Sequence, residues 1–417
     1  MTDAIQSQAG PSRSARILIS VLVALAYNCG FGLTYGSYGV VLSAYQSEFG
    51  ISRAEASLGL TAFVFGLCVA SPLAGLVLQR VPIRLCLVLS AGIAAAGYMA
   101  MAYATSFEQI IALFAIVGCC ACFLSIVGPV TLIGQWFDIG RGKALAITTL
   151  PMLQLLTPLV AAQLMPAYGY KTVLMSVGGV LALVALLLVF VRDRPAVASD
   201  APVAANAVPS LTGAAESNDE RDFTTAEILR SSSFWFVSLG VGMIAGGGVM
   251  FSVHAIPFAV GREIPLHQAA IFLSMFGGAG MIGILIFGWL ADRLQATTAF
   301  AMCALFQVLI WVAMIMTSRF ELLLVISALI GACMMSVPAL HGAALTELFG
   351  RRSVSRAMGF SYFIKLPFML GAAPMAGYLF DRTGNYVAAF ASQTTLLLIA
   401  GLLFAYLAFF YLRPRPA

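Results

Sequence analysis

Long apolar segments recur along almost the whole of this chain, and they restrict its fold more than any other feature. Each is at least about 18 residues long, enough for a helix to cross a hydrocarbon core of roughly 30 Å. Backbone polar groups in hydrocarbon must be hydrogen-bonded internally, so these segments must be helices. Charged residues make up only 9% of the chain, against about 25% in soluble globular domains. The sequence therefore predicts an all-α membrane protein.

Charges and turn residues divide the apolar segments into about twelve predicted transmembrane helices. The predicted spans are 17–45, 56–79, 85–104, 108–134, 144–167 and 171–191, then 234–260, 268–291, 297–317, 322–346, 357–380 and 387–411. The polar residues 1–16 are followed by a long apolar run with no small-residue cleavage site. We therefore expect the first span to be retained and not cleaved as a signal peptide.

A polar stretch at 192–233, rich in Ala, Pro, Ser and acidic residues, interrupts the pattern and is typical of a flexible linker. It separates two six-helix bundles. The predicted segments are a tail at 1–16, bundles at 17–191 and 234–412, the linker at 192–233 and a tail at 413–417.

The basic residues predict the orientation of the chain in the membrane. If the N-terminus is cytoplasmic, most of the 22 Lys and Arg residues lie in cytoplasmic loops, as the positive-inside rule requires. We therefore expect a multi-pass protein of the cell inner membrane with both termini and the linker in the cytoplasm. This asymmetry also explains the formal charge of +5, so no nucleic acid partner is needed.

Neither an enzyme nor a metal site is indicated. All eight cysteines fall in predicted spans, where we expect free thiols packed as small apolar residues. Cys119, Cys120 and Cys122 are close in sequence but point in different directions on one helix. The polar segments contain no phosphate-binding loop and no nucleophile–base motif, so we expect no cofactor. The linker is too short for a nucleotide-binding domain, which excludes an ATP-driven pump.

The two halves repeat each other in their loops. The loop after the second span reads Gly75-Leu-Val-Leu-Gln79-Arg80, and the loop after the eighth reads Gly288-Trp-Leu-Ala-Asp292-Arg293. The loop after the fourth reads Trp136-Phe-Asp138-Ile-Gly-Arg141-Gly-Lys143-Ala144, and the loop after the tenth reads Phe349-Gly-Arg351-Arg352-Ser-Val-Ser-Arg356-Ala357. Duplicated bundles predict a solute site between the halves near the midplane, exposed alternately by rocking.

These loops and the six-plus-six arrangement resemble the major facilitator superfamily over residues 17–411. The resemblance implies that Asp292, Arg293, Arg80 and Arg141 form a conformational latch on the cytoplasmic side in the outward-facing state. Gln79 departs from the pattern, because an aspartate usually occupies that position. We therefore expect only the Asp292 half of the latch to be fully charged.

Within that superfamily, Tyr362-Phe-Ile-Lys365 and Asp381-Arg382-Thr-Gly384 resemble the monocarboxylate and oxalate–formate branch. The resemblance implies that Lys365 binds a substrate carboxylate. Two positions depart from the branch: Ile284 replaces an arginine, and Gly280 replaces the aspartate that carries a proton in the monocarboxylate carriers. A dicarboxylate gripped at both ends is therefore disfavoured, while one lysine still balances one carboxylate.

Three ionisable residues fall inside predicted spans, where charge is costly and commonly functional. Lys365 lies roughly 12 Å into its span at about 1.5 Å per residue, and His341 lies at a comparable depth. His254 lies toward the outer end of the seventh span. The structural alternatives are a lysine folded against backbone carbonyls and histidines that only hydrogen-bond between helices.

Uncharged polar residues complete the candidate substrate site: Tyr27, Asn28 and Tyr35 in the first span and Gln154 in the fifth. Tyrosines and amides offer aromatic walls and hydrogen bonds to an organic solute. The alternative for each is helix packing, which the small residues around Tyr27 and Tyr35 also favour.

The sequence thus predicts a monomeric secondary transporter for a small organic anion, most simply a monocarboxylate, working by alternating access. One alternative is a carrier for a neutral or amphipathic compound such as a vitamin or drug. A second is a non-transporting membrane sensor or receptor. The expected partners are the solute, membrane lipid, and either a coupled proton or a counter-anion; uniport, symport and exchange stay open.

Overall fold

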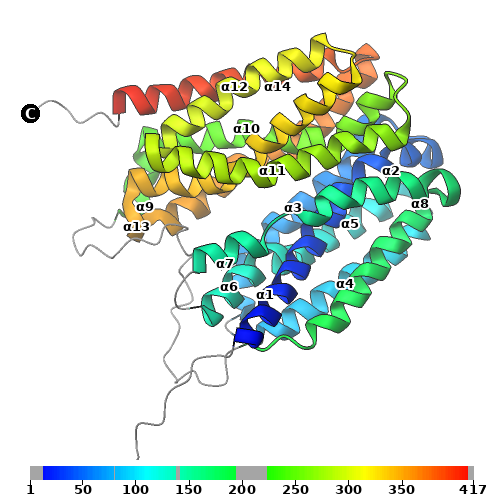
Figure 1. The fold of residues 1–417 in the computed structure, drawn as a ribbon, viewed down its shortest axis with the longest axis horizontal. Coiled ribbons are helices and arrows are strands. Elements are labelled where there is room, and N and C mark those ends of the chain that lie inside the picture. The colour runs from blue at the N-terminus through cyan, green and yellow to red at the C-terminus, as the bar shows by residue number, and fades with distance from the viewer. Residues whose placement is uncertain (1–12, 79, 138–140, 194–222, 412–417) are drawn as a thin grey trace, which may run out of the picture.

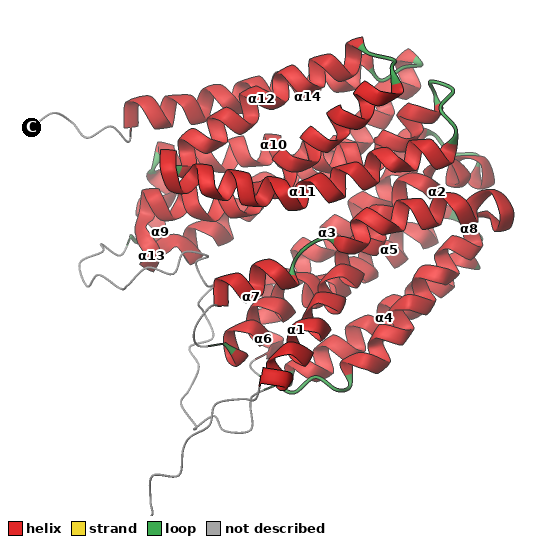
Figure 2. Ribbon diagram, in the orientation of Figure 1, coloured by secondary structure: helices red, strands yellow, loops and turns green. Residues whose placement is uncertain are grey.

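In a computed structural model, the described residues are 13–78, 80–137, 141–193 and 223–411. They are helical almost throughout, and no strand occurs among them (Figure 2). The elements before the linker, with η marking a π-helical segment, are α1 (Arg13–Tyr27), η1 (Asn28–Gly32), α2 (Leu33–Phe49), α3 (Arg53–Leu78), α4 (Ile83–Ala102), α5 (Phe107–Ala121), η2 (Cys122–Val127), α6 (Gly128–Trp136), α7 (Arg141–Thr148) and α8 (Met152–Leu188). Those after it are α9 (Thr225–Arg230), α10 (Ser232–Val260), α11 (Leu266–Leu294), α12 (Ala296–Met316), α13 (Phe320–Thr383), α14 (Val387–Tyr406) and η3 (Leu407–Tyr411).

The number of membrane-spanning helices agrees with the sequence. The described residues contain 11 stretches long and apolar enough to cross a membrane. One of them, 144–188, is broken at Gly169 (φ 75°, ψ 173°). Residues with a Cβ atom rarely adopt this backbone conformation. Gly350 (φ 70°, ψ 171°) divides α13 in the same way. The prediction of an all-α protein with about twelve spans is confirmed.

Two groups of helices form the molecule (Figure 1). In the first, α3 packs on α5 and α4 on α8; in the second, α10 and α11 pack on α13, and α12 on α14. The main contacts between the groups are made by α2 with α10, α3 with α13, and α8 with α11. The interface between the halves is therefore built from these six helices.

An equivalent close contact between two helices occurs in both halves. A Cβ added to Gly118 on α5 would lie 2.0 Å from the carbonyl oxygen of Phe63 on α3. In the second half, a Cβ on Gly331 of α13 would lie 2.0 Å from the carbonyl oxygen of Phe276 on α11. Only glycine allows two helix backbones to approach this closely. The equivalent contact supports the internal repeat seen in the loops.

The chain differs from the sequence prediction at the start of the fifth span, where a single helix was expected over 144–167. The helix stops after Thr148 and restarts at Met152, with Pro151 immediately before it at φ −81° and ψ 59°. Proline disfavours helical geometry in the residue before it, so the interruption follows from Pro151. It leaves backbone groups that another helix must satisfy.

The predicted linker is described only at its ends, since 194–222 lie outside the described residues. Its last part contains α9, which the sequence analysis did not anticipate. Thr224 and Glu227 form a reciprocal capping box at the start of this helix, which satisfies two backbone donors. α9 packs against α10 and α13.

Candidate functional site

Lys365 is buried in the second part of α13, with 8% of its surface exposed. Its ammonium group lies 3.2 Å from the centroid of the Tyr362 ring, a favourable cation–π geometry. Among the described residues, Lys365 has neither a hydrogen-bond nor an ion-pair partner. A buried cation without a counter-charge is costly, so this position favours an anionic ligand.

Glycines on α10 bring Lys365 close to that helix. A Cβ on Gly242 would lie 3.0 Å from the Cα atom of Lys365, and one on Gly246 would lie 2.9 Å from the carbonyl oxygen of Phe368. The absence of side chains at these positions lets α10 and α13 pack backbone to backbone. This packing fixes the depth of Lys365 in the second bundle.

His341 lies beside Lys365, close enough for the two to interact electrostatically. One ring nitrogen, Nε2, is 2.8 Å from the Ser361 hydroxyl, and the ring lies 6.1 Å from that of Tyr362. The other ring nitrogen, Nδ1, has no hydrogen-bond partner within the described ranges. The imidazole can therefore accept or donate one further hydrogen bond.

The first half contributes α3 to the same region, and two contacts fix its register against α13. A Cβ on Gly377 would lie 2.6 Å from Ala54, and the Thr61 hydroxyl donates to the Leu370 carbonyl at 3.2 Å. Two helical turns from Thr61, the same face of α3 carries Cys68. Cys68 lies within electrostatic range of Lys365. From the sequence alone Cys68 is expected to be a packing residue, and nothing in its surroundings along the chain marks it as part of the site.

The two helices separate at the level of Lys365. Phe363 lies two turns from Leu370 on the face of α13 that contacts α3 further along, yet 66% of its surface is exposed. Tyr362 beside it is 39% exposed. The interface is thus closed from Gly377 to Leu370 and open beyond it, toward Arg356. Lys365 lies between Leu370 and Phe363, at the boundary between the closed and the open part.

Tyr27 and Tyr35 belong to a line of aromatic rings along the first span. The Tyr27 and Phe31 rings lie 6.3 Å apart, Phe31 and Tyr35 stack at 4.2 Å, and Tyr35 meets Phe63 of α3 at 5.9 Å. Tyr35 also lies near Cys68. The row of rings therefore ends at α3, on the same helix as Cys68. It forms an apolar wall with hydroxyl groups at Tyr27 and Tyr35.

Asn28 bridges the π-helical segment η1 to the interruption between α7 and α8. Its amide nitrogen donates to the carbonyls of Ala24 (2.9 Å) and Leu150 (3.0 Å), and its amide oxygen accepts from the Leu153 N–H (2.8 Å). The amide thus bonds to backbone groups on both sides of Pro151. Asn28 lies near the predicted site, but its hydrogen bonds go to the backbone.

Gln154 is fully buried where the two halves meet. A Cβ on Gly277 of α11 would lie 3.1 Å from the backbone of Gln154, and one on Gly32 would lie 2.8 Å from its backbone nitrogen. Neither side-chain polar atom of Gln154 has a hydrogen-bond partner in the described parts of the chain. Buried amides are normally satisfied, so this side chain is available to a solute or to water.

His254 lies apart from Lys365, at the closed end of the interface. Its Nδ1 is 2.9 Å from the Tyr386 hydroxyl, and its Nε2 is 2.9 Å from the Ala373 carbonyl and 3.3 Å from the Ser57 hydroxyl. Both ring nitrogens are therefore already engaged by protein groups. The structure does not bring His254 together with Lys365 and His341.

The predicted latch residues lie at the opposite end of the molecule. Asp292, Arg293 and Arg80 are exposed, and the Arg293 guanidinium rests 4.9 Å from the Trp289 ring. No ion pair joins these three within the described residues. The side chain of Arg141 lies outside the described part of the structure. An unformed latch agrees with an interface that is open at this end.

The two positions that depart from the monocarboxylate pattern differ in their surroundings. A Cβ on Gly280 would lie 2.3 Å from the Met335 side chain and 3.3 Å from the Gly331 carbonyl, so Met335 fills the space that an aspartate would need. Ile284, where an arginine was expected, is half-buried on α11. Lys365 is thus without either of these charged partners.

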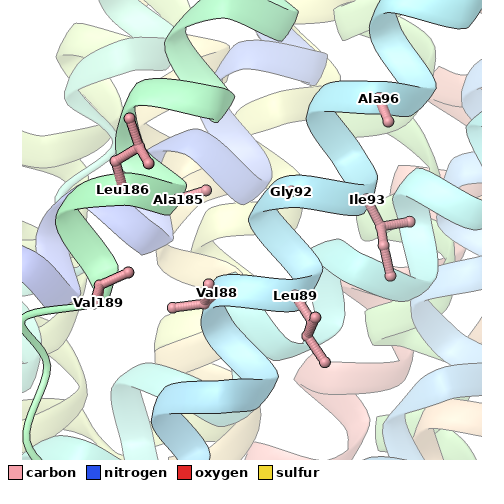
Figure 3. Close-up of a pocket in the computed structure, with 8 residues that line it drawn as sticks. All are labelled: Val88, Leu89, Gly92, Ile93, Ala96, Ala185, Leu186 and Val189. Carbon is pink, nitrogen blue, oxygen red and sulfur yellow. The ribbon is translucent and has the colours of Figure 1, made fainter.

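A separate groove of about 380 Å³ lies between α4 and α8 (Figure 3). It is lined by Val88, Leu89, Gly92, Ile93, Ala96, Ala185, Leu186 and Val189. Leu89 and Leu186 are 52% and 68% exposed, as expected for a surface that faces lipid. The groove offers no polar side chain, so it does not compete with the Lys365 region as a solute site.

Comparison with known proteins agrees with this architecture. The sequence profile of the Major Facilitator Superfamily matches residues 23–318 and 255–417. Among solved structures, a bacterial homolog of the human lysosomal transporter Spinster, in an inward-facing and unoccupied conformation, superposes with a TM-score of 0.71. The two share 16% identity, and the match covers 95% of this chain and 96% of that one. At this identity the likeness establishes the fold alone.

Monocarboxylate transporters are among the similar sequences. Monocarboxylate transporter 12 of Rattus norvegicus is 32% identical over 166 residues, which are 39% of this chain and 34% of that protein. Monocarboxylate transporter 6 of Homo sapiens is 24% identical over 408 residues, covering 93% of this chain and 78% of that protein. The stronger match thus spans only about a third of its relative, and the longer match is distant.

Proposed function

This chain belongs to the major facilitator superfamily of transporters, and on that premise we propose that it carries a small organic monocarboxylate across the cell inner membrane. Lys365 is the residue that would hold the carboxylate. His341, Tyr35 and Gln154 would contribute hydrogen bonds, with Tyr27 in the aromatic wall. Asn28 would position the first span, and His254 would belong to the closed end of the interface.

The observation that carries this proposal is the uncompensated charge of Lys365. The ammonium is buried beside the Tyr362 ring, and no acidic side chain pairs with it in the described residues. A solute carboxylate at about 4 Å would supply roughly 4 kcal/mol of attraction at an effective dielectric constant near 20. The solute would thereby replace the missing counter-charge.

The surroundings of Lys365 favour one carboxylate over two. Ile284 stands where a second cation was expected, and Met335 occupies the space beside Gly280. A second carboxylate would have to be desolvated without a partner, which is strongly unfavourable. The names of the similar monocarboxylate transporters also support this solute class.

Alternating access would proceed from the conformation described here. The interface is closed from Gly377 to Leu370, while Phe363 is open. If both termini are cytoplasmic, as the basic loops predict, the open side faces the cytoplasm. Transport would then close the Arg356 end, forming the latch at Asp292, and open the other.

For coupling, we favour proton-linked symport over exchange of anions. Neither an acid at position 280 nor a carboxylate beside Lys365 is available in the described residues to carry the proton. Lys365 itself, or His341 beside it, would then hold the proton. A bound carboxylate would keep the neighbouring lysine charged, so that proton and anion would bind in order.

A carrier for a neutral or amphipathic compound is the second candidate. The observations that favour it are the replaced arginine at Ile284 and the aromatic row from Tyr27 to Phe63. In that case Lys365 would remain stacked on Tyr362, and its charge would not contact the solute.

Ligand-induced stabilisation separates these candidates. Purified protein would be heated with acetate, lactate, pyruvate or benzoate, and with neutral amides of the same acids. A ligand at about 100 times its Kd stabilises the folded state by about 2.7 kcal/mol. We expect a carboxylate to stabilise wild type and the surface control Lys171→Gln, but not Lys365→Gln. Stabilisation of Lys365→Gln by the same carboxylate, or stabilisation of wild type only by a neutral amide, would refute the anion assignment.

A further inference from the structure

We propose that Asp381 is the clasp that closes the carrier at the end opposite the Asp292 latch, by capping the N-terminus of α3 across the interface between the halves. The proposal rests on the proposed alternating access, because a clasp has a function only if this end must open. The residues concerned are Asp381 with the backbone of Arg53 and Ala54.

The contact is made by both oxygens of one carboxylate. Asp381 lies near the end of α13, in the second half, and α3 belongs to the first half. One oxygen accepts from the Arg53 N–H at 3.1 Å, and the other accepts from the Ala54 N–H at 2.9 Å. The first N–H groups of a helix lack partners within it, and a negative charge there is favoured by the helix dipole.

The Arg53 side chain reinforces the contact through other residues. Its guanidinium lies 3.8 Å from the Phe380 ring centroid and donates to the Tyr386 hydroxyl at 3.1 Å. It forms no ion pair with Asp381 in the described structure. Backbone and side chain of Arg53 thus hold two separate elements of the second half, the end of α13 and the start of α14.

Tyr386 extends the network to His254 and back to α3. The Tyr386 hydroxyl accepts from Arg53, so its own proton is free to be donated to Nδ1 of His254. Nε2 then carries the hydrogen, which it donates to the Ala373 carbonyl with the Ser57 hydroxyl nearby. The neutral Nε2–H tautomer satisfies every one of these contacts.

Behind the clasp the two helices approach closely and then part. A Cβ on Gly377 would lie 2.6 Å from the Cα atom of Ala54, and Thr61 donates to the Leu370 carbonyl at 3.2 Å. Further along, Phe363 is 66% exposed. This seam therefore separates Lys365 from the Asp381 end. A solute could reach Lys365 from that end only after the seam has opened.

The chemistry of the clasp suits a contact that opens repeatedly. Asp381 is exposed at the edge of the seam, so water can replace Arg53 and Ala54 when the helices separate. Hydrogen bonds to a charged group are stronger than those between neutral groups. Losing them should shift the population toward the open state by about tenfold or more.

The test measures the opening directly. Ala373→Cys places a thiol at a fully buried position of the seam without altering the carbonyl that His254 uses. In nanodiscs, where both faces are accessible, a charged maleimide would be added, and alkylation at position 373 would be measured by peptide mass spectrometry. We expect Asp381→Ala to raise the alkylation rate about tenfold or more, with a smaller rise for Asp381→Asn. Arg382→Ala, an exposed neighbour whose side chain rests 5.0 Å from the Tyr378 ring, should leave the rate unchanged.

An unchanged rate in Asp381→Ala, or an equal rise in Arg382→Ala, would overturn the clasp. The labelling requires no solute, so its result is independent of the substrate assignment. Carboxylate-induced stabilisation of the same variants is the companion measurement. If Asp381→Ala leaves the alkylation rate unchanged while a carboxylate still stabilises the protein, the clasp alone is refuted. If the alkylation rate rises as expected but no carboxylate stabilises the protein, the anion site alone is refuted.

Discussion

Replacing Asn28 tests whether this residue holds the first span in place or contacts the solute. Its amide makes three hydrogen bonds to backbone groups of Ala24, Leu150 and Leu153. Asn28→Ala removes all three and leaves the carbonyl of Leu150 without that partner beside the Pro151 interruption. The account predicts a loss of stability, because the interruption depends on this amide.

The size of the effect follows from the number of bonds. Hydrogen bonds between membrane helices contribute about 0.6 kcal/mol on average, and typical protein hydrogen bonds about 1 kcal/mol. Three of them give a destabilisation of roughly 2–3 kcal/mol for Asn28→Ala. Asn385→Ala is a matched control, since the Asn385 amide bonds only to neighbours in an exposed turn. We expect it to cost well under 1 kcal/mol.

The assay is reversible unfolding in mixed micelles of dodecyl maltoside and SDS, followed by solute uptake in proteoliposomes. Asn28→Ala should lower the free energy of unfolding and the maximal transport rate, with little change in the apparent KM. The reasoning would be refuted by a variant as stable as wild type whose KM is raised. That result would assign Asn28 to solute binding instead.

Three further changes test other parts of the account. Gly280→Asp should destabilise the protein because Met335 fills the space at that position, and Met335→Ala should restore folding; a stable single variant would contradict this packing. Cys68 should be alkylated more slowly when a transported carboxylate is bound, whereas the buried Cys333 should be unreactive throughout; equal rates at Cys68 with and without the carboxylate would remove it from the site. On a cysteine-free background, Glu263→Cys should react with an impermeant maleimide in intact cells, and Arg192→Cys only after permeabilisation; the reverse pattern would invert the topology.

The sequence predicts the fold well because apolar length and helix formation are directly linked in a membrane. Lys365 was also identifiable, since a charged residue in an apolar segment stands out by its cost. The interruption before Met152 was missed, although Pro151 signals it. Its consequence for Asn28 depends on which helices are neighbours, and sequence spacing does not reveal this.

The contacts across the interface were the least predictable part. Cys68 resembles any small packing residue until the register of α3 against α13 brings it near Lys365. Asp381 was visible within a motif, but its partners are backbone N–H groups of Arg53 and Ala54, which carry no side-chain signal. His254 was grouped with Lys365 as an ionisable residue in a span; its bonds to Tyr386 and Ala373 instead belong to the seam.

The central claim, that Lys365 binds the carboxylate of the solute, is tested most directly by transport in proteoliposomes that enclose a pH-sensitive dye. Acetate, lactate, pyruvate and benzoate would be offered to wild type, Lys365→Gln and the control Lys171→Gln, whose lysine lies on the surface 3.5 Å from Glu48. Loss of roughly 4 kcal/mol of attraction corresponds to about a thousandfold weaker interaction. The account predicts that wild type and Lys171→Gln take up at least one of these acids and acidify the lumen, while Lys365→Gln does neither. Normal carboxylate uptake by a folded Lys365→Gln would contradict it.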